Sequence, residues 1–273
     1  MNPDHQPHHR PGLLLHLSAP LQSWGERSQF NERDTAAFPT RSGVVGLLAA
    51  ALGRRRHEPI DDLARLSLTV RTDRPGVLLR DLHTVGGGLA GRDTVTTADG
   101  KKRSGATATL LSHRDYLADA AFTAALTGTD QDLLADCAAA LRAPAWPPYL
   151  GRRSCPPEGP LLIGLLDQPL HHLVHLPIAR RARAASGLSP SVRVLFHGDR
   201  PLDRLPVPPG DGDDGSSPSG QITDDPLGFH PRTRAYRARP RYQRAIELPA
   251  DQCAGHGTAY LTELNNYLEG SST

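Results

Sequence analysis

The sequence predicts an α+β fold, because strand and helix patterns alternate along its first half. A short apolar run at 13–17 and an alternation of apolar and polar residues at 66–70 are each typical of a β-strand. Between them, apolar residues within 44–52 recur every three or four positions, which indicates one buried face of a helix. A long hairpin, a further strand and a second helix follow. This order is the β-α-β-β-α-β plan of a ferredoxin-like domain, here with one connection enlarged into a protruding arm.

The first helix has recognisable signals at both ends. Thr40 or Ser42 can cap its start directly after a proline, and Gly53 suits its C-terminal end. The strand that precedes the helix is expected to end at Ala19-Pro20, where a polar loop begins.

The arm is predicted at residues 77–118. The segment VLLRDLHTV leads out, a glycine-rich polar tip runs from Gly86 to Gly105, and TATLLSHRDYL leads back. The apolar segment AAFTAAL then predicts a strand, and a second helix is expected at 130–142. Cys137 lies in the apolar face of that helix, so we interpret it as a core residue.

The second half is expected to contain a smaller β-rich part. Apolar runs at 161–166, 173–178 and 192–197 predict strands, and AIELP predicts a last one. The acidic, low-complexity segment 206–225 is expected to be a mobile loop. The expected division is a disordered tail at 1–11, a ferredoxin-like domain at 12–168, a C-terminal β-rich extension at 169–250, and a tail or short helix at 251–273.

Composition excludes several classes of protein. The 273 residues suffice for a buried core, and no apolar run approaches the roughly 20 residues of a membrane span. The polar, proline-rich N-terminus does not resemble a secretory signal, so a cytoplasmic protein is expected. Three widely spaced cysteines argue against a disulfide framework or a cysteine-built zinc site. The formal net charge is only +2, so the placement of the arginines says more than their number.

Four basic stretches are candidates for binding a polyanion. The segment 38–43 combines free N–H groups of a helix start, two hydroxyls and an arginine, which suits a phosphate, although a simple helix cap is the plainer interpretation. The segment 149–154 combines an aromatic ring, a glycine and two arginines, which suits a stacked base and its phosphates, or else forms a solvated turn. The hairpin tip Lys101–Arg103 fits a nucleic-acid backbone or a charged turn. The arginines of 232–244 form either a basic face or a solvated loop offset by the preceding acidic segment.

Signals for catalysis are sparse. His83 lies near Asp81 and Tyr116 lies next to Asp115, and a His/Tyr/Lys group could cleave RNA by general acid–base chemistry. The spacing does not demand such a site. His171, His172 and His175 resemble a metal-binding pattern, but they are expected in a strand with a structural role. No cofactor or metal is expected.

Several multi-residue motifs together resemble one family. In chain order these are PLQSWG at 20–25, FPTRSG at 38–43 leading into VVGLLAAALG, DLHTV at 81–85, RDYLAD at 114–119 and PYLGRRSCP at 148–156. They resemble the CasD family of the RAMP superfamily, whose members cap the 5′ handle of the crRNA in type I-E CRISPR Cascade complexes. The match covers about residues 13–166 and is loose beyond 170.

The resemblance implies a modified ferredoxin-like (RRM-like) domain with a β-hairpin thumb and a small C-terminal β element. It implies crRNA as ligand, the CasC backbone subunit and the CasA large subunit as neighbours with other Cascade subunits, target DNA only indirectly, and no membrane. Trp24 is expected to pack in its loop rather than to stack on RNA. The expected RNA-binding residues are Arg27, Thr40, Arg41, Ser42, Gly43, His83, Lys101, Lys102, Arg103, Tyr149, Gly151, Arg152 and Arg153.

The resemblance also favours binding without catalysis. Related subunits of type I-C systems process crRNA with a tyrosine–lysine–histidine group, whereas a separate subunit, CasE, cuts the RNA in type I-E systems. The motifs here follow the type I-E pattern. Two alternatives stay open, a metal-independent crRNA-processing endoribonuclease of the same fold and an unrelated RRM-like RNA-binding module.

Overall fold

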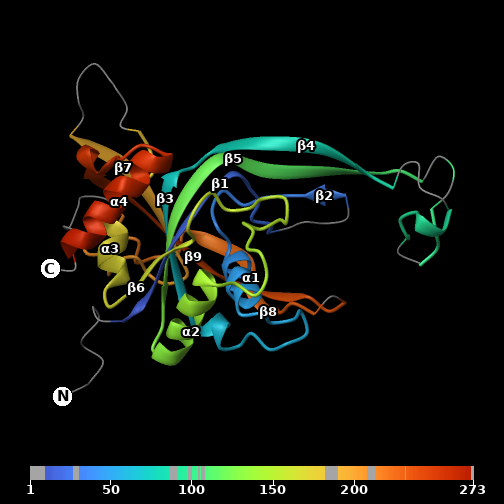
Figure 1. The fold of residues 1–273 in the computed structure, drawn as a ribbon, viewed down its shortest axis with the longest axis horizontal. Helices are drawn as coiled ribbons and strands as arrows, with labels where there is room; N and C mark the ends of the chain where they lie inside the picture. The colour runs from blue at the N-terminus through green and yellow to red at the C-terminus, as the bar shows by residue number, and fades with distance from the viewer. Residues whose placement is uncertain are drawn as a thin grey trace.

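The computed structural model describes residues 10–26, 31–86, 91–97, 100–103, 105, 108–181, 190–207, 213–230 and 232–271. Its strands are β1 (Gly12–Gln22), β2 (Glu32–Arg33), β3 (Ser67–Arg74), β4 (Val77–Val85), β5 (Leu110–Thr127), β6 (Leu162–Leu166), β7 (Ser191–Gly198), β8 (Gly220–Gly228) and β9 (Ala235–Pro249). Its α-helices are α1 (Arg41–Ala51), α2 (Gln131–Arg142), α3 (Pro169–His175) and α4 (Gly257–Ser271). Figure 1 shows these elements around one large sheet.

The sheet has the strand order β6-β1-β5-β3-β7-β9-β8. Within its first four strands, β1 is antiparallel to both β5 and β6, and β3 is antiparallel to β5. Helix α1 connects β1 to β3, and α2 connects β5 to β6, so each helix joins two strands that are separated by one antiparallel neighbour. The predicted α+β fold class with its long hairpin is therefore confirmed, and the element order follows the predicted β-α-β-β-α-β plan.

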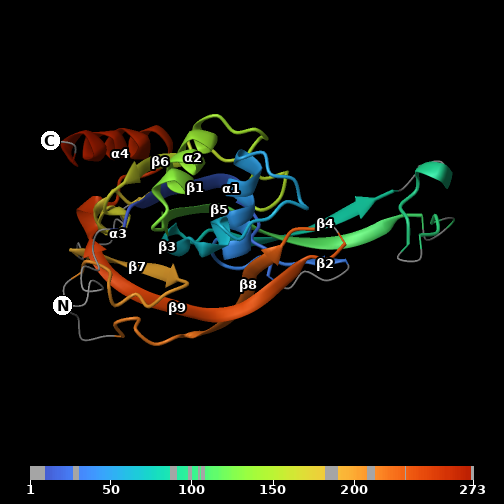
Figure 2. The same cartoon turned by 90° about the horizontal axis from the view of Figure 1, so that it is seen from below.

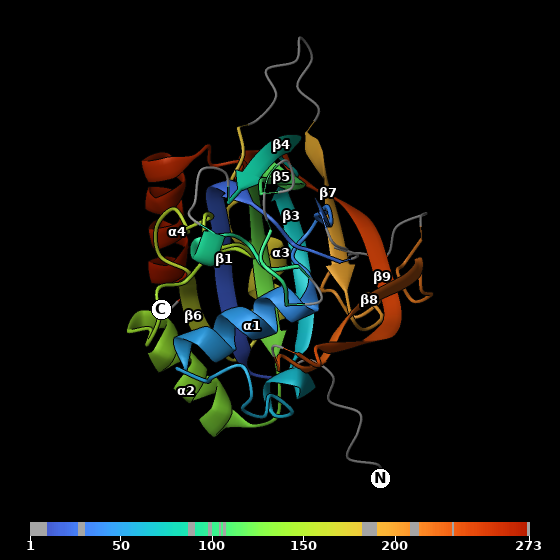
Figure 3. The same cartoon turned by 90° about the vertical axis from the view of Figure 1, so that its right-hand side faces the viewer.

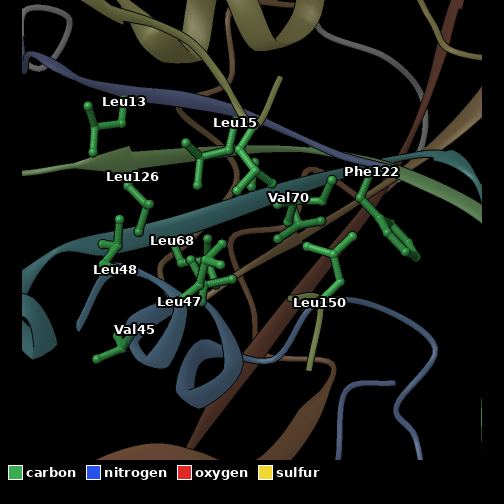
Figure 4. Close-up of a cluster of buried hydrophobic side chains, with 14 of the residues drawn as sticks. Leu13, Leu15, Val45, Leu47, Leu48, Leu68, Val70, Phe122, Leu126 and Leu150 are labelled. Atoms are coloured by element: carbon green, nitrogen blue, oxygen red, sulfur yellow. The ribbon is translucent and has the colours of Figure 1, made fainter. Parts of the chain in front are cut away.

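Helices cover both faces of the sheet, which explains the continuous apolar run at its start. Leu13, Leu15 and Leu17 of β1 point to a core shared with α1 and α2, whereas Leu14 points to a second core shared with α3 and α4. Figure 4 shows Leu13 and Leu15 in the first of these cores, with side chains of α1 and β3 around them. Each leucine buried in this way stabilises the fold by about 1.5–3 kcal/mol.

The arm consists of β4 and the first half of β5. Residues 110–118 of β5 pair with β4, and residues from Leu117 onward pair with β1 inside the sheet. Figures 1 and 2 show this hairpin extending far from the body. The two strands leave the sheet at a bend, where Gly76 and Asp119 both have positive φ. A Cβ atom at Gly76 would lie 2.6 Å from the carbonyl oxygen of Ala118, so only glycine fits there.

Three elements differ from the sequence prediction. β1 continues through Pro20 to Gln22 instead of ending at Ala19-Pro20, and its outer partner β6 reaches only Leu15. The strand predicted at 173–178 is wrong, because α3 occupies 169–175 with Pro169 at its first turn, a helix-start signal. The structure also contains a strand, β8, that begins within the segment 206–225 predicted to be an acidic loop and continues to Gly228. Residues 1–9 of the predicted tail lie outside the described residues.

Candidate nucleic-acid interface

A tight loop at residues 149–155 lies against the end of β1. The backbone N–H of Ser23 donates to the carbonyl of Leu150 at 3.1 Å, and Leu150 itself is fully buried. Gly151 has φ +87°, and a Cβ atom there would lie only 1.5 Å from the carbonyl oxygen of Ser23. Cys155 closes the loop by accepting a backbone hydrogen bond from Leu150 at 2.8 Å, and burial raises the pKa of its thiol. Glycine at position 151 is therefore a requirement of this contact.

Arg152 holds the loop to the base of the arm. Its guanidinium donates to the carbonyl of Asp115 at 3.1 Å and to that of Arg33 at 2.7 Å. The same group lies over the ring of Tyr116, 4.6 Å from the ring centroid. Because these contacts tie β5, β2 and the loop together, Arg152 positions the site rather than offering its charge to solvent.

The neighbouring side chains of the loop face outward. Arg153 is exposed, and Tyr149 is half-buried. Two arginines that the sequence did not single out lie at the same arm base, since β2 pairs in parallel with β5 and places Arg33 opposite Arg114. Arg33 is exposed and Arg114 is half-buried. These two residues are distant in sequence, so a local motif could not have revealed that they are neighbours.

The arm base also contains an exposed ion-pair group. Glu32 contacts Arg80 at 2.5 Å and the Nδ1 atom of His113 at 2.9 Å. The hydrogen bond from His113 is the main cause that lowers the pKa of Glu32, with the charge of Arg80 acting in the same direction. This group links β2 to both strands of the arm.

The tip of the arm is a separate cationic site. Lys101 and Lys102 are exposed, and Arg103 is half-buried. The Nζ atom of Lys102 donates to the carbonyl of Thr94 at 3.0 Å, which folds the tip back on itself. The six residues from Leu79, beside the loop, to Val85 span about 20 Å at 3.3 Å per residue. The structure therefore does not bring the tip and the loop 149–155 together.

The helix start at 40–43 is not an open phosphate site. Thr40 is 1% exposed and Arg41 is 7% exposed. The backbone N–H of Arg41 donates to a carboxylate oxygen of Asp224 at 2.7 Å, so an internal anion already lies at this helix N-terminus. The Arg41 guanidinium contacts Asp225 at 3.0 Å, Asp199, and the carbonyls of Leu66 and Ala64. The prediction that Thr40 and Arg41 contact RNA is not supported by this geometry, because both residues are buried and the Arg41 guanidinium is bonded within the protein.

The other two residues of this motif are only partly covered. Ser42 and Gly43 are half-buried, and a Cβ atom at Gly43 would lie 2.7 Å from the ring of Trp24. Trp24 is 1% exposed, and its Nε1 donates to Gln22 at 3.0 Å. Trp24 thus packs in its loop, as the sequence predicted. Arg27, in the same loop, lies outside the described residues.

The candidate catalytic residues do not converge. His83 is half-buried on β4, with its Nδ1 3.6 Å from a carboxylate oxygen of Asp81. Tyr116 is buried beneath Arg152 and opposite Leu79, four residues from His83 along β4, which is about 13 Å. Lys101 and Lys102 lie beyond the end of the strands. A joint His/Tyr/Lys group is therefore not assembled in this structure.

The three histidines at 171–175 lie on helix α3. The rings of His171 and His175 stack with centroids 4.2 Å apart, and His172 hydrogen-bonds Tyr267 of α4 at 3.0 Å. Burial lowers the pKa of both His171 and His172. Over the described residues, no group of three or more potential metal-binding side chains is found.

Comparisons with known proteins agree on one family. The family model described as "CRISPR-associated protein (Cas_Cas5)" matches residues 12–242. The "CRISPR system Cascade subunit CasD" of Escherichia coli (strain K12) is 38% identical over an alignment of 171 residues that covers 56% of this chain and 70% of that protein. In the part of the chain that is described, no helix is long and apolar enough to cross a membrane.

Solved structures are similar over almost the whole chain. One, described as "CRISPR RNA-guided surveillance complex", contains a chain that is 40% identical with a TM-score of 0.78, covering 94% of this chain and 99% of that one. A second, described as "Crystal structure of Cas protein", is 32% identical with a TM-score of 0.57, covering 90% of this chain and 99% of the other.

Proposed function

The chain belongs to the CRISPR-associated Cas5 family, with CasD among its relatives, and we propose that it is a non-catalytic RNA-binding subunit of a type I-E Cascade surveillance complex. In this role it caps the 5′ handle of the crRNA in the cytoplasm. The observation that carries the proposal is the outward-facing loop 149–155. It carries Tyr149 and Arg153, and Gly151 and Arg152 hold it in place. Arg152 bonds the backbone of Arg33, whose strand partner is Arg114.

The chemistry of this loop suits a kinked, single-stranded RNA. A half-exposed tyrosine offers a ring on which a base can stack, and exposed guanidinium groups bind phosphates. Ser42 and Gly43 remain possible contacts of a neighbouring nucleotide, whereas Thr40 and Arg41 are removed from the proposed site. Lys101, Lys102 and Arg103 at the arm tip would reach a more distant part of the guide.

The arm supports the proposal that partner subunits cover it. Exposed apolar side chains occur on both of its faces, and among them Val77 and Leu78 are 70% and 64% exposed. The remaining ones are Leu79, Leu82 and Leu111. A hairpin with two apolar faces outside the body is typical of an element that becomes buried in an assembly. We therefore propose that the backbone subunit CasC packs against the arm, with the large subunit CasA next to the handle.

The proposal of binding without cleavage is supported by the separation of the catalytic candidates. His83 is about 13 Å from Tyr116 along the arm, and the lysine pair is farther still. General acid–base cleavage requires such groups within hydrogen-bond reach of one phosphate. This arrangement favours a binding subunit over the crRNA-processing endoribonuclease.

A competition experiment tests handle recognition. The purified chain is titrated with a fluorescent RNA that carries the 5′ handle, and the same RNA with a scrambled handle serves as competitor. We expect the intact handle to compete at least tenfold better than the scrambled one, since splayed bases are read individually. Equal competition would contradict handle recognition and favour an unrelated RRM-like RNA-binding module.

A further inference from the structure

We propose that the tip of the β8–β9 hairpin is a second nucleic-acid contact, which binds the phosphodiester backbone independently of the handle site. The tip surface consists of Arg232, Arg234 and Arg237, with Leu227 and Tyr236 beside them. All five residues are exposed. This contact would be additional to the proposed handle site, because it lies on the β8–β9 hairpin and not on the loop 149–155.

The structure separates five of the six arginines of 232–244 into two groups. Arg239 pairs with the fully buried Asp224 at 2.6 Å, and Arg244 donates to the carbonyl of Leu202 at 3.1 Å. These two arginines hold β9 to the body. Arg237 pairs with Asp225 at 2.6 Å, yet its side chain stays 67% exposed. Together with Arg232 and Arg234, it therefore keeps its charge at the surface, on the part of the hairpin nearest to the turn.

The anchors at the base of the hairpin are carboxylates buried under arginines. Asp225 accepts hydrogen bonds from both Arg41 of α1 and Arg237 of β9. Asp224 accepts from the backbone of Arg41 and from Arg239. Both acidic residues of β8 are thereby neutralised at the body, and the sequence from 226 to 244 contains no acidic residue. The charged side chains nearest the turn are therefore all positive.

Local hydrogen bonds tie Arg232 and Thr233, beside these arginine side chains, to His230. The backbone N–H of Thr233 donates to the carbonyl of His230 at 3.2 Å, and the backbone N–H of Arg232 donates to the Nδ1 atom of His230 at 3.3 Å. These bonds use backbone groups and leave the arginine side chains exposed. A turn fixed in this way loses less conformational entropy when its cations bind a ligand.

The position of the hairpin suits a long, continuous polyanion. In Figures 1 and 3 the β8–β9 tip points to the same side of the molecule as the arm, with α1 between the two. Arg232 and Arg234, together with Arg237, which bonds Asp225 yet stays largely exposed, match a row of phosphates by charge. Tyr236 adds a ring for an unpaired base. The phosphodiester backbone could belong to the guide RNA or to target DNA.

The test compares two double variants of the full-length chain. Arg232→Ala/Arg234→Ala removes two tip charges. Arg181→Ala/Arg193→Ala removes two exposed charges elsewhere, and Arg193 lies opposite Glu247, ten residues or about 33 Å from Arg237 along β9. Affinity for a mixed-sequence single-stranded RNA and for a DNA duplex of equal length is measured from 50 to 300 mM KCl, and thermal unfolding verifies that each variant is folded.

We expect the tip variant to bind at least one probe about tenfold more weakly. The slope of the logarithm of the binding constant against the logarithm of the salt concentration should be smaller in magnitude by about one to two. The Arg181/Arg193 variant should bind like the unaltered chain, and Arg232→Lys/Arg234→Lys should restore the slope. A loss confined to the RNA assigns the surface to the guide, and a loss confined to the duplex assigns it to target DNA. Unchanged affinity and slope for both probes would overturn the proposal. Handle preference over a scrambled handle is measured separately, so either proposal can fail alone.

Discussion

Two arginine-containing motifs of this chain look alike in sequence, but one is buried in the structure and the other keeps an exposed arginine. The helix start 40–43 and the loop 149–154 each combine arginine, glycine and a hydroxyl. At the helix start, Arg41 is enclosed by Asp199, Asp224 and Asp225. In the loop, Arg152 contacts only carbonyl groups and an aromatic ring, and Arg153 stays at the surface.

The difference shows what decides whether an arginine is available for a ligand. The local sequence supplies the cation, but distant carboxylates determine its partner. Asp224 and Asp225 lie on strand β8, more than 180 residues after Arg41 in the chain, and they cover the helix start. No acidic side chain is bonded to Arg152 or to Arg153 in the described part of the structure, so the positive charge of Arg153 remains directed to solvent.

The largest expected effect concerns the stability of the helix start. Arg41→Ala leaves the buried carboxylate of Asp199 without its guanidinium partner and leaves Asp225 with Arg237 alone. Breaking such a buried pair costs about 3–5 kcal/mol. Urea unfolding should show this loss in the free energy of unfolding. Arg153→Ala is the matched control and should change stability by less than about 0.5 kcal/mol. Similar losses for both variants would contradict the distinction drawn between the two motifs.

Gly151→Ala should damage the loop without removing any charge. The positive φ alone costs about 1–2 kcal/mol for alanine, and the new Cβ atom meets the carbonyl of Ser23, so the loop must move. We expect a clear drop in the unfolding midpoint together with weaker binding of handle RNA. Gly159→Ala is the control, since it shares a positive φ but has no atom within 4 Å of the added Cβ. If Gly151→Ala bound RNA normally, the loop would not be the handle site.

Two buried histidines should make the stability of the fold depend on pH. His197 stacks on Phe38 with ring centroids 4.0 Å apart, and burial lowers the pKa of His197 from 6.5 to about 4. His16 is lowered to about 4 in the same way. The unfolded chain therefore binds a proton at each histidine below pH 6.5 that the folded chain does not bind, so stability is full above pH 6.5 and falls as the pH decreases toward 4.

Each histidine should lower the free energy of unfolding by about 2 kcal/mol at pH 5, because each pH unit below 6.5 costs about 1.36 kcal/mol. Urea unfolding at pH 7, 6 and 5 measures it, and His197→Phe should reduce the slope by about half. Asp199 acts in the opposite direction, since burial raises its pKa, so the comparison with the variant isolates the histidine. A wild-type stability that does not change between pH 7 and 5 would contradict the neutral, buried state of these histidines.

The smallest effect is expected for Arg153→Ala on RNA binding. Loss of one exposed phosphate contact should weaken handle binding about five- to tenfold and reduce the salt slope by about one. Fluorescence anisotropy at several salt concentrations measures both quantities, with Arg142→Ala as a charge control on α2, where the side chain is exposed. If the two variants bound equally, Arg153 would have no place in the proposed site.

Much of the fold could be predicted because its signals are local. Helix α1 has Thr40 at its N-cap position, a periodic apolar face and Gly53 after its end, and it was placed correctly to within a residue or two. The Thr40 side chain itself makes no capping hydrogen bond. Helix α3 was missed because its seven residues are too few to show a period, and a run with β-branched and apolar residues was interpreted as a strand. Strand β8 was missed because Asp224 and Asp225 disfavour a strand unless arginines from other elements neutralise them.

The candidate site was predictable only where its residues are contiguous. The segment 149–154 could be recognised as a unit, but the pairing of Arg33 with Arg114 follows from a parallel β2–β5 contact that no local pattern encodes. The same reason explains why the burial of the helix start could not be predicted, since the capping carboxylate is 183 residues away from Arg41.

The central claim is that the chain binds the crRNA handle without cutting RNA. The most direct measurement incubates the purified chain with labelled repeat RNA and with processed crRNA carrying the 5′ handle, and resolves bound species on a native gel and products on a denaturing gel. We expect a shifted band with the handle-bearing RNA and intact RNA in every lane. Cleavage at a defined position within the repeat, lost in a His83→Ala variant, would contradict the claim and make the chain a processing enzyme.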